Sequence, residues 1–136
     1  MRDRQEHWYV DLLLISDSHA DNAYAGTTGA EVVPFENNSI EGSNSVLERD
    51  WNRYLEDVAR ANKLICNIDL VTDNSLTTAE RAQYKAEAKI FRAMVMFDMV
   101  RLWGDFPVIT TVADDITSEN IDEVYPQYLP QTKYGT

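Results

Sequence analysis

Residues 86–109, AEAKIFRAMVMFDMVRLWGDFPVI, constrain the fold most, because a long apolar-rich helix meets a sequence that must end it. Gly104 can take the backbone conformation that closes a helix. Pro107 disfavours helix at Phe106 and lacks the amide donor that a helix interior needs. The chain is therefore predicted to turn and to continue as an extended segment over about residues 105–113. This pattern predicts local structure, and it indicates no catalytic or binding function.

A helix is predicted over about residues 46–71, where apolar residues recur at intervals of three and four. Asn44 or Ser45 can cap its start. The sequence Thr-Asp-Asn-Ser at 72–75 predicts a turn after it. The spacing therefore predicts the first arm of a helical hairpin.

The second arm is predicted over about residues 78–102, and Thr77 with Glu80 fits a capping box at its start. One face carries a stripe of apolar side chains, while further apolar residues widen the surface enough to predict burial on more than one side. The stripe consists of Ala82, Ala86, Ile90, Ala93, Phe97 and Val100.

The flanking regions predict less regular structure. A first helix is expected over about residues 2–15, a long polar loop over 16–45 and an irregular tail over 114–136. Long loops inside compact domains are uncommon and are often functional, so the loop is the best place to look for a ligand. The fold class is mostly α. The chain is expected to be a piece of something longer, because one hairpin cannot bury its faces unless others stack on it.

Composition narrows the function. The formal net charge of −11 argues against binding nucleic acid or an anionic membrane surface, which would repel the chain. Cys66 is the single cysteine, so no intrachain disulfide can form. No run of about 18 apolar residues predicts a membrane span, and residues 1–10 lack the apolar core of a secretory signal.

A metal site and a cofactor are not predicted. A calcium loop starting at Asp17 would place Asn22 where the template requires Gly and Thr28 where it requires Glu. His7 and His19 are not at the spacing of a zinc site. The Asp- and Asn-rich segment therefore reads as a polar surface turn.

Catalysis is not predicted either. Glu87 lies beside the apolar stripe and is expected to form a structural ion pair with Arg92 or Arg60. No nucleophile elbow, phosphate loop or Cys/His arrangement accompanies it.

A ligand surface is predicted in the long loop. A sugar ring needs a flat apolar face for stacking and amide or carboxylate groups for its hydroxyls. Asp21, Asn22 and Tyr24 supply this combination at short range. These three residues are the candidate ligand-binding residues.

Two blocks of the sequence resemble the SusD/RagB family. The first is residues 51–65, WNRYLEDVARANKLI, and the second runs from Glu87 through Arg92 to the WGDFP of residues 103–107. SusD/RagB proteins are lipid-anchored outer-membrane proteins of Gram-negative bacteria that capture glycans or peptides for a partner transporter.

This resemblance implies a mostly helical fold with tetratricopeptide-like hairpins and a loop-rich side that carries the ligand site. It also implies that residues 1–136 are the N-terminal portion of a single, larger SusD-like domain. It implies non-catalytic binding of glycans or other nutrients at the cell surface and delivery to a SusC-type TonB-dependent transporter. It also implies a signal peptide and an acylated cysteine upstream of residue 1. The two blocks mark the scaffold, so the ligand itself is not predicted.

Two other function classes stay open. A generic tetratricopeptide-like protein-interaction module would bind peptides and would have no acylated cysteine upstream. A glycan hydrolase fragment that uses loop carboxylates such as Asp17 and Asp21 would shorten its ligand as well as bind it.

Overall fold

The computed structural model describes residues 6–20, 22–24, 26–72, 75–112 and 116–131. The chain forms two compact units, residues 1–53 and residues 54–136. It is mostly helical, as predicted, and a two-stranded ladder is the sheet found in the described part. That both units belong to one larger domain stays a prediction.

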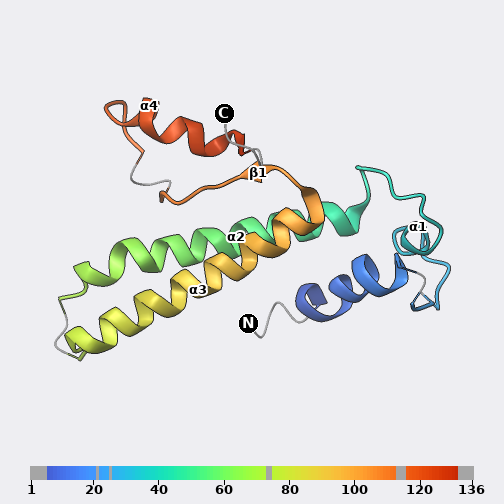
Figure 1. Ribbon diagram of the computed structural model, residues 1–136, viewed down its shortest axis with the longest axis horizontal. Helices are drawn as coiled ribbons and strands as arrows, with labels where there is room; N and C mark the ends of the chain where they lie inside the picture. The colour runs from blue at the N-terminus through green and yellow to red at the C-terminus, as the bar shows by residue number, and fades with distance from the viewer. Residues whose placement is uncertain (1–5, 21, 25, 73–74, 113–115, 132–136) are drawn as a thin grey trace. The chain divides into compact units, whose positions relative to one another are not determined.

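The first unit begins with a helical segment over residues 6–18, drawn in blue in Figure 1. Most of it has wide π-type turns, η2 (Glu6–Asp11) and η3 (Leu14–Ser18). The helix continues past the predicted end at residue 15. The Ser16 hydroxyl donates to the Leu12 carbonyl at 2.6 Å, so this polar residue is satisfied inside the helix instead of ending it.

The long loop contains one element that the sequence pattern missed, the single-turn helix α1 (Val33–Glu36). Pro34 lies in its first turn, where a missing amide donor costs nothing. Phe35 is fully buried and α1 packs against η3, so this short apolar group supplies a core residue to the first unit. The prediction of a loop throughout 16–45 was therefore wrong at α1.

Helix α2 (Ser45–Asn67) begins after Asn44, whose side-chain oxygen accepts from the Val46 amide at 2.9 Å. This is the predicted cap. At its other end the chain tightens into the 3-10 turn η4 (Ile68–Leu70), whereas the apolar pattern had extended the helix to about residue 71.

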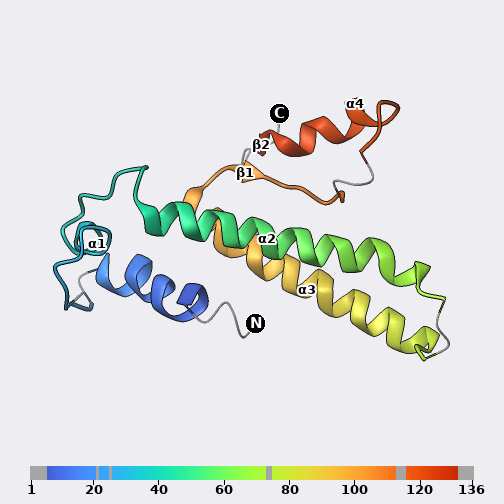
Figure 2. The same cartoon turned by 180° about the vertical axis from the view of Figure 1, so that it is seen from behind.

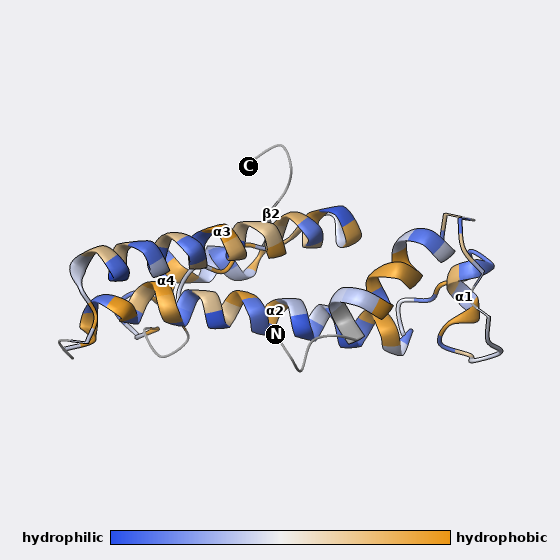
Figure 3. Cartoon of the chain, turned by 90° about the horizontal axis from the view of Figure 1, so that it is seen from below, coloured by the Kyte–Doolittle hydropathy of each residue, from blue (hydrophilic) through white to orange (hydrophobic). Residues whose placement is uncertain are grey.

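In the second unit, α3 (Thr78–Trp103) lies alongside α2 in both Figure 1 and Figure 2. The predicted capping box is present, because Thr77 accepts from the Glu80 amide while the Glu80 carboxylate accepts from the Thr77 amide. Apolar residues occur along both helices (orange in Figure 3).

The face of α3 that packs in this unit is not the predicted stripe. Ala88, Val95 and Met99 are buried, whereas Ile90 is 71% exposed and Phe97 is 61% exposed. Helical periodicity identifies faces, but it does not decide which of two apolar faces is covered.

A buried amide ties three segments of the second unit together. The Asn62 side chain is 1% exposed, and its Nδ2 donates to the Ile109 carbonyl at 2.9 Å. Its Oδ1 accepts from Arg92 Nη1 at 2.6 Å. Asn62 thus joins α2, α3 and the extended segment after α3 by two hydrogen bonds.

The helix stop at Gly104 forms as predicted. Gly104 has a φ of 73° and donates its amide to the Val100 carbonyl. Over residues 105–112, the described part of the predicted extended segment, the regular structure is the two-residue strand β1 (Phe106–Pro107). It pairs antiparallel with β2 (Pro130–Gln131).

The described part of the tail, residues 116–131, has more regular structure than the sequence predicted. It contains α4 (Ile121–Val124) and the 3-10 turn η6 (Tyr125–Tyr128). Gln127 Oε1 accepts from the Thr110 amide at 2.9 Å and from both threonine hydroxyls of residues 110 and 111. Contacts with a distant segment therefore order residues that have no periodic pattern of their own.

Candidate functional site in the long loop

Two of the three predicted ligand residues lie on an exposed turn after η3. The amides of Asn22 and Ala23 both donate to the Asp17 carbonyl, at 2.9 and 3.1 Å, which fixes the turn to the end of the helix. Asn22 is exposed and Tyr24 is 78% exposed. Asp21 lies outside the described residues. The Tyr24 ring is therefore open to a stacking partner.

The same loop forms a groove that sequence reasoning missed. Its volume is about 280 Å³, and it has apolar, hydroxyl, amide and carboxylate groups along its wall. The lining residues are Ala30, Pro34, Ser39, Glu41, Ser43 and Asn44. The sequence signal that could have indicated this groove is the polar run ENNSIEGSNS at residues 36–45.

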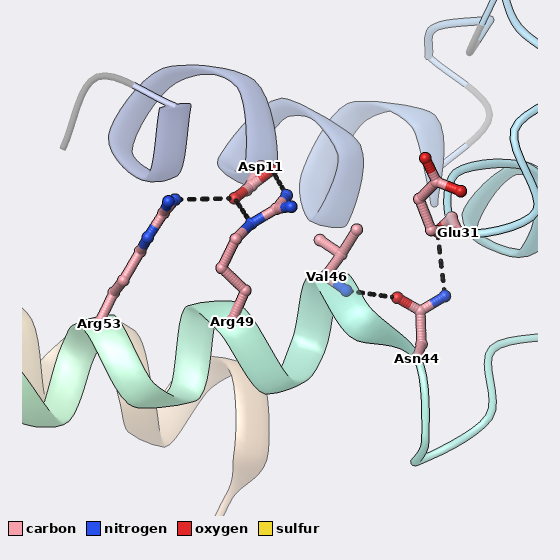
Figure 4. Close-up of polar contacts among 6 residues, drawn as sticks. All are labelled: Asp11, Glu31, Asn44, Val46, Arg49 and Arg53. Carbon is pink, nitrogen blue, oxygen red and sulfur yellow. Dashed lines mark hydrogen bonds and ion pairs between the residues drawn. The ribbon is translucent and has the colours of Figure 1, made fainter. Parts of the chain in front are cut away.

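Asn44 joins the start of α2 to the loop at Glu31, next to the lining residue Ala30 (Figure 4). Its Nδ2 donates to the Glu31 carbonyl at 3.0 Å, while its Oδ1 caps α2 at Val46. Both polar atoms of the amide are engaged within the fold. Asn44 therefore shapes the groove.

A buried ion pair attaches the first helix to α2. Asp11 is fully buried, and Arg49 donates to both of its carboxylate oxygens, at 2.6 and 3.1 Å. Arg53 Nη1 lies 3.6 Å from Asp11 Oδ2 (Figure 4). Burial raises the pKa of Asp11 above its ordinary value of 3.8, Arg49 opposes this shift, and the neighbouring carboxyl of Asp50 adds to it.

The predicted ion pair of Glu87 does not form. Glu87 is exposed and accepts from Gln83 Nε2 at 2.8 Å, one turn earlier on α3. Arg92 bonds to Asn62, and Arg60 lies 3.8 Å from Asp57. The two arginines therefore have other partners, which the local pattern around Glu87 could not reveal.

The described ranges were compared with the requirements for a metal site and for a membrane-spanning helix. No cluster of three or more His, Cys, Asp or Glu side chains that could hold a metal ion is found there. None of the helices in those ranges is both long and apolar enough to cross a bilayer.

The second unit has a cleft of about 250 Å³ with a mostly apolar wall. Leu55, Val58 and Ala59 line it from α2, and Ile109 and Val112 line it from the extended segment. Asn62, Thr111 and Tyr128 complete the lining. Asn62 and Thr111 already form hydrogen bonds within the unit, so few polar groups remain for the hydroxyls of a sugar. The loop groove is the better candidate for a polar ligand.

Residues from the two sequence blocks that resemble the SusD/RagB family contact one another in the second unit. The rings of Tyr54 and Trp103 meet edge to face with centroids 5.5 Å apart. Asn62 and Arg92 form the hydrogen bond described above, and Gly104 ends α3. These residues hold the hairpin together and lie in a different unit from the loop groove.

Comparison with known proteins now decides the family. The SusD-like family described as "Starch-binding associating with outer membrane" matches residues 5–134. The chain belongs to the SusD-like family. The predicted resemblance is thus confirmed. The description of the family associates the family with starch binding and with the outer membrane.

One SusD-like relative comes from Bacteroides ovatus. It is 28% identical over 95 residues, which cover 70% of this chain and 16% of the relative. The match therefore spans a small part of the relative's length. No solved structure matches this SusD-like chain.

Proposed function

We propose that this SusD-like chain is part of a non-catalytic cell-surface protein that captures glycans and passes them to a SusC-type TonB-dependent transporter. The family match over residues 5–134 carries this proposal. The exposed Tyr24 ring and the Asn22 amide on one turn support a sugar-binding role for the loop. Asp21 is included in the proposed surface.

The remaining parts of the proposal follow from the family. The whole protein is expected to be lipid-anchored and to face outward from the outer membrane. Sequencing the DNA on both sides of this segment tests the anchor, because an upstream signal with an acylated cysteine is expected. An adjacent transporter gene would support the partner.

The exposed α3 face supports a longer, tetratricopeptide-like fold. Large apolar side chains rarely form a contiguous exposed stripe in a stable monomer. Four residues of α3 form such a stripe: Ile90, Met94, Phe97 and Val100. We propose that further helical hairpins of the full-length protein cover this face. A continuation that lacks helical hairpins would contradict this part of the proposal.

Binding of maltoheptaose, measured by isothermal titration, tests the ligand surface. Tyr24→Ala is expected to weaken binding about tenfold or more, since loss of an aromatic contact of about 1.4 kcal/mol corresponds to that factor. Tyr125→Ala is the matched control, because Tyr125 is also exposed but lies in the second unit. Equal affinities of the two variants would remove Tyr24 from the site.

Prolonged incubation of the protein with maltoheptaose distinguishes capture from hydrolysis. A capture protein leaves the oligosaccharide at its original length, whereas a hydrolase shortens it. Chromatography of the sugar after prolonged incubation measures this difference. Shortening that disappears in Asp17→Asn would support the hydrolase class instead.

A further inference from the structure

We infer that the loop groove is a subsite for one sugar ring that is neutral or carries a protonated amine, and that Glu41 makes it reject acidic sugars. This inference rests on the proposed capture function and adds a charge preference to it. The observations that carry it are the shape of the groove, the groups that line it and the placement of the nearby positive charges.

The size and wall of the groove suit a small polyol. Pockets for drug-sized ligands begin at about 300 Å³, so a groove of about 280 Å³ fits a smaller unit. Ser39 and Ser43 each offer a hydroxyl that can both donate and accept. Ala30 and Pro34 give an apolar patch for the carbon face of a ring.

The side chain of Asn44 fixes the loop at one edge of the groove. Asn44 bridges the Glu31 carbonyl and the start of α2, and so acts as a positioning residue. A Cβ atom added to Gly42, between Glu41 and Ser43, would meet no atom within 4 Å. Ser39, Glu41 and Ser43 are themselves exposed, so a ligand can approach the two serines and the carboxylate.

The charge at the groove is negative. Glu41 is the charged residue of the lining, and it is exposed. Arg49 and Arg53 are the Lys or Arg residues of the first unit that the structure describes, since Arg2 and Arg4 lie outside the described residues. Both are directed to the buried Asp11 (Figure 4). The neighbouring carboxyl of Asp50 also interacts with Asp11, so two carboxyls stand against the two arginines and the cluster leaves no excess positive charge to offset Glu41.

This arrangement favours some ligands over others. A carboxylate or sulfate on the ring would face Glu41 within a chain of formal charge −11, and like charges repel. A protonated amine would be attracted, and a neutral ring would bind through the hydroxyls alone. Glu41 is therefore a specificity-determining residue.

Titration of the 136-residue chain with three trisaccharides at low ionic strength tests the inference. The probes are maltotriose, fully deacetylated chitotriose and trigalacturonate. Trigalacturonate is expected to bind at least about tenfold more weakly than maltotriose. Glu41→Gln is expected to remove most of this difference and to weaken chitotriose binding. Glu48→Gln is the matched control, because it removes the same charge from an exposed position on α2 outside the groove.

The outcomes separate the inference from the capture proposal. If wild type binds trigalacturonate as tightly as maltotriose, or if the Glu41 and Glu48 variants behave alike, the charge preference is wrong while capture stands. If Ser39→Ala combined with Ser43→Ala leaves maltotriose binding unchanged, the ring lies elsewhere and the inference fails. If wild type binds none of the three probes, the capture proposal falls with it.

Discussion

Replacing Asn62 should destabilise the second unit more than any exposed polar substitution. The amide is 1% exposed and has two partners, the Ile109 carbonyl at 2.9 Å and Arg92 at 2.6 Å. A neutral hydrogen bond contributes about 1 kcal/mol and one to a charged group about 1.5–3 kcal/mol. Asn62→Ala removes both and leaves the two partners part-buried, so a loss of about 2–4 kcal/mol in unfolding free energy is expected.

Urea unfolding followed by circular dichroism measures this loss, with Asn67→Ala as the control. Asn67 is on the same helix and is exposed, and its Nδ2 donates to the Lys63 carbonyl at 2.8 Å. Its replacement should change the unfolding free energy by less than about 0.5 kcal/mol. Combining Asn62→Ala with Arg92→Met in a double-mutant cycle should show a coupling of about 1–2 kcal/mol.

A change below about 0.5 kcal/mol in Asn62→Ala, or additivity with Arg92→Met, would contradict a stabilising role of the Asn62 hydrogen bonds. Either result would mean that water replaces the two hydrogen bonds at little cost. The buried amide would then have no special role in joining the three segments.

Two further predictions concern the first helix and the helix stop. Because burial raises the pKa of Asp11 above 3.8, the native state binds the carboxyl proton more tightly than the unfolded state does. The stability that this proton binding contributes is present in full below pH 3.8 and is lost as the pH rises through the raised pKa. Asp11→Asn should therefore gain stability relative to wild type as the pH rises from about 3 to about 7, measured by urea unfolding at each pH; a trend in the opposite direction would mean that the Arg49 ion pair dominates. Gly104→Ala should cost about 1–3 kcal/mol, since its φ of 73° is strained for a residue with a Cβ; an unchanged melting temperature would contradict this.

Much of the helical structure could be predicted because it depends on neighbours in the sequence. The capping box of Thr77 and Glu80 joins residues three positions apart, and the Gly104 stop closes onto Val100 four positions earlier. Such short-range bonds can be predicted from the sequence. The two blocks that resemble the SusD/RagB family could also be recognised there, and they predicted the family. The exposed Tyr24 followed from the polar loop around it, although its ligand role stays a proposal.

The loop groove could be predicted only in part. The polar run at residues 36–45 was visible, but α1 and the Asn44 bridge to Glu31 determine that the run closes into a groove. The bridge spans thirteen positions and has no sequence pattern of its own.

Local pattern by itself determined that α2 and α3 form, where each begins, and that α3 is apolar on two faces. The tertiary structure decided which face is covered, that Arg92 bonds Asn62 thirty positions away instead of Glu87, and that the patternless tail pairs with β1. The physical reason is the range of the interactions. Backbone geometry and caps act within one turn, whereas burial and through-space hydrogen bonds depend on which distant segments meet.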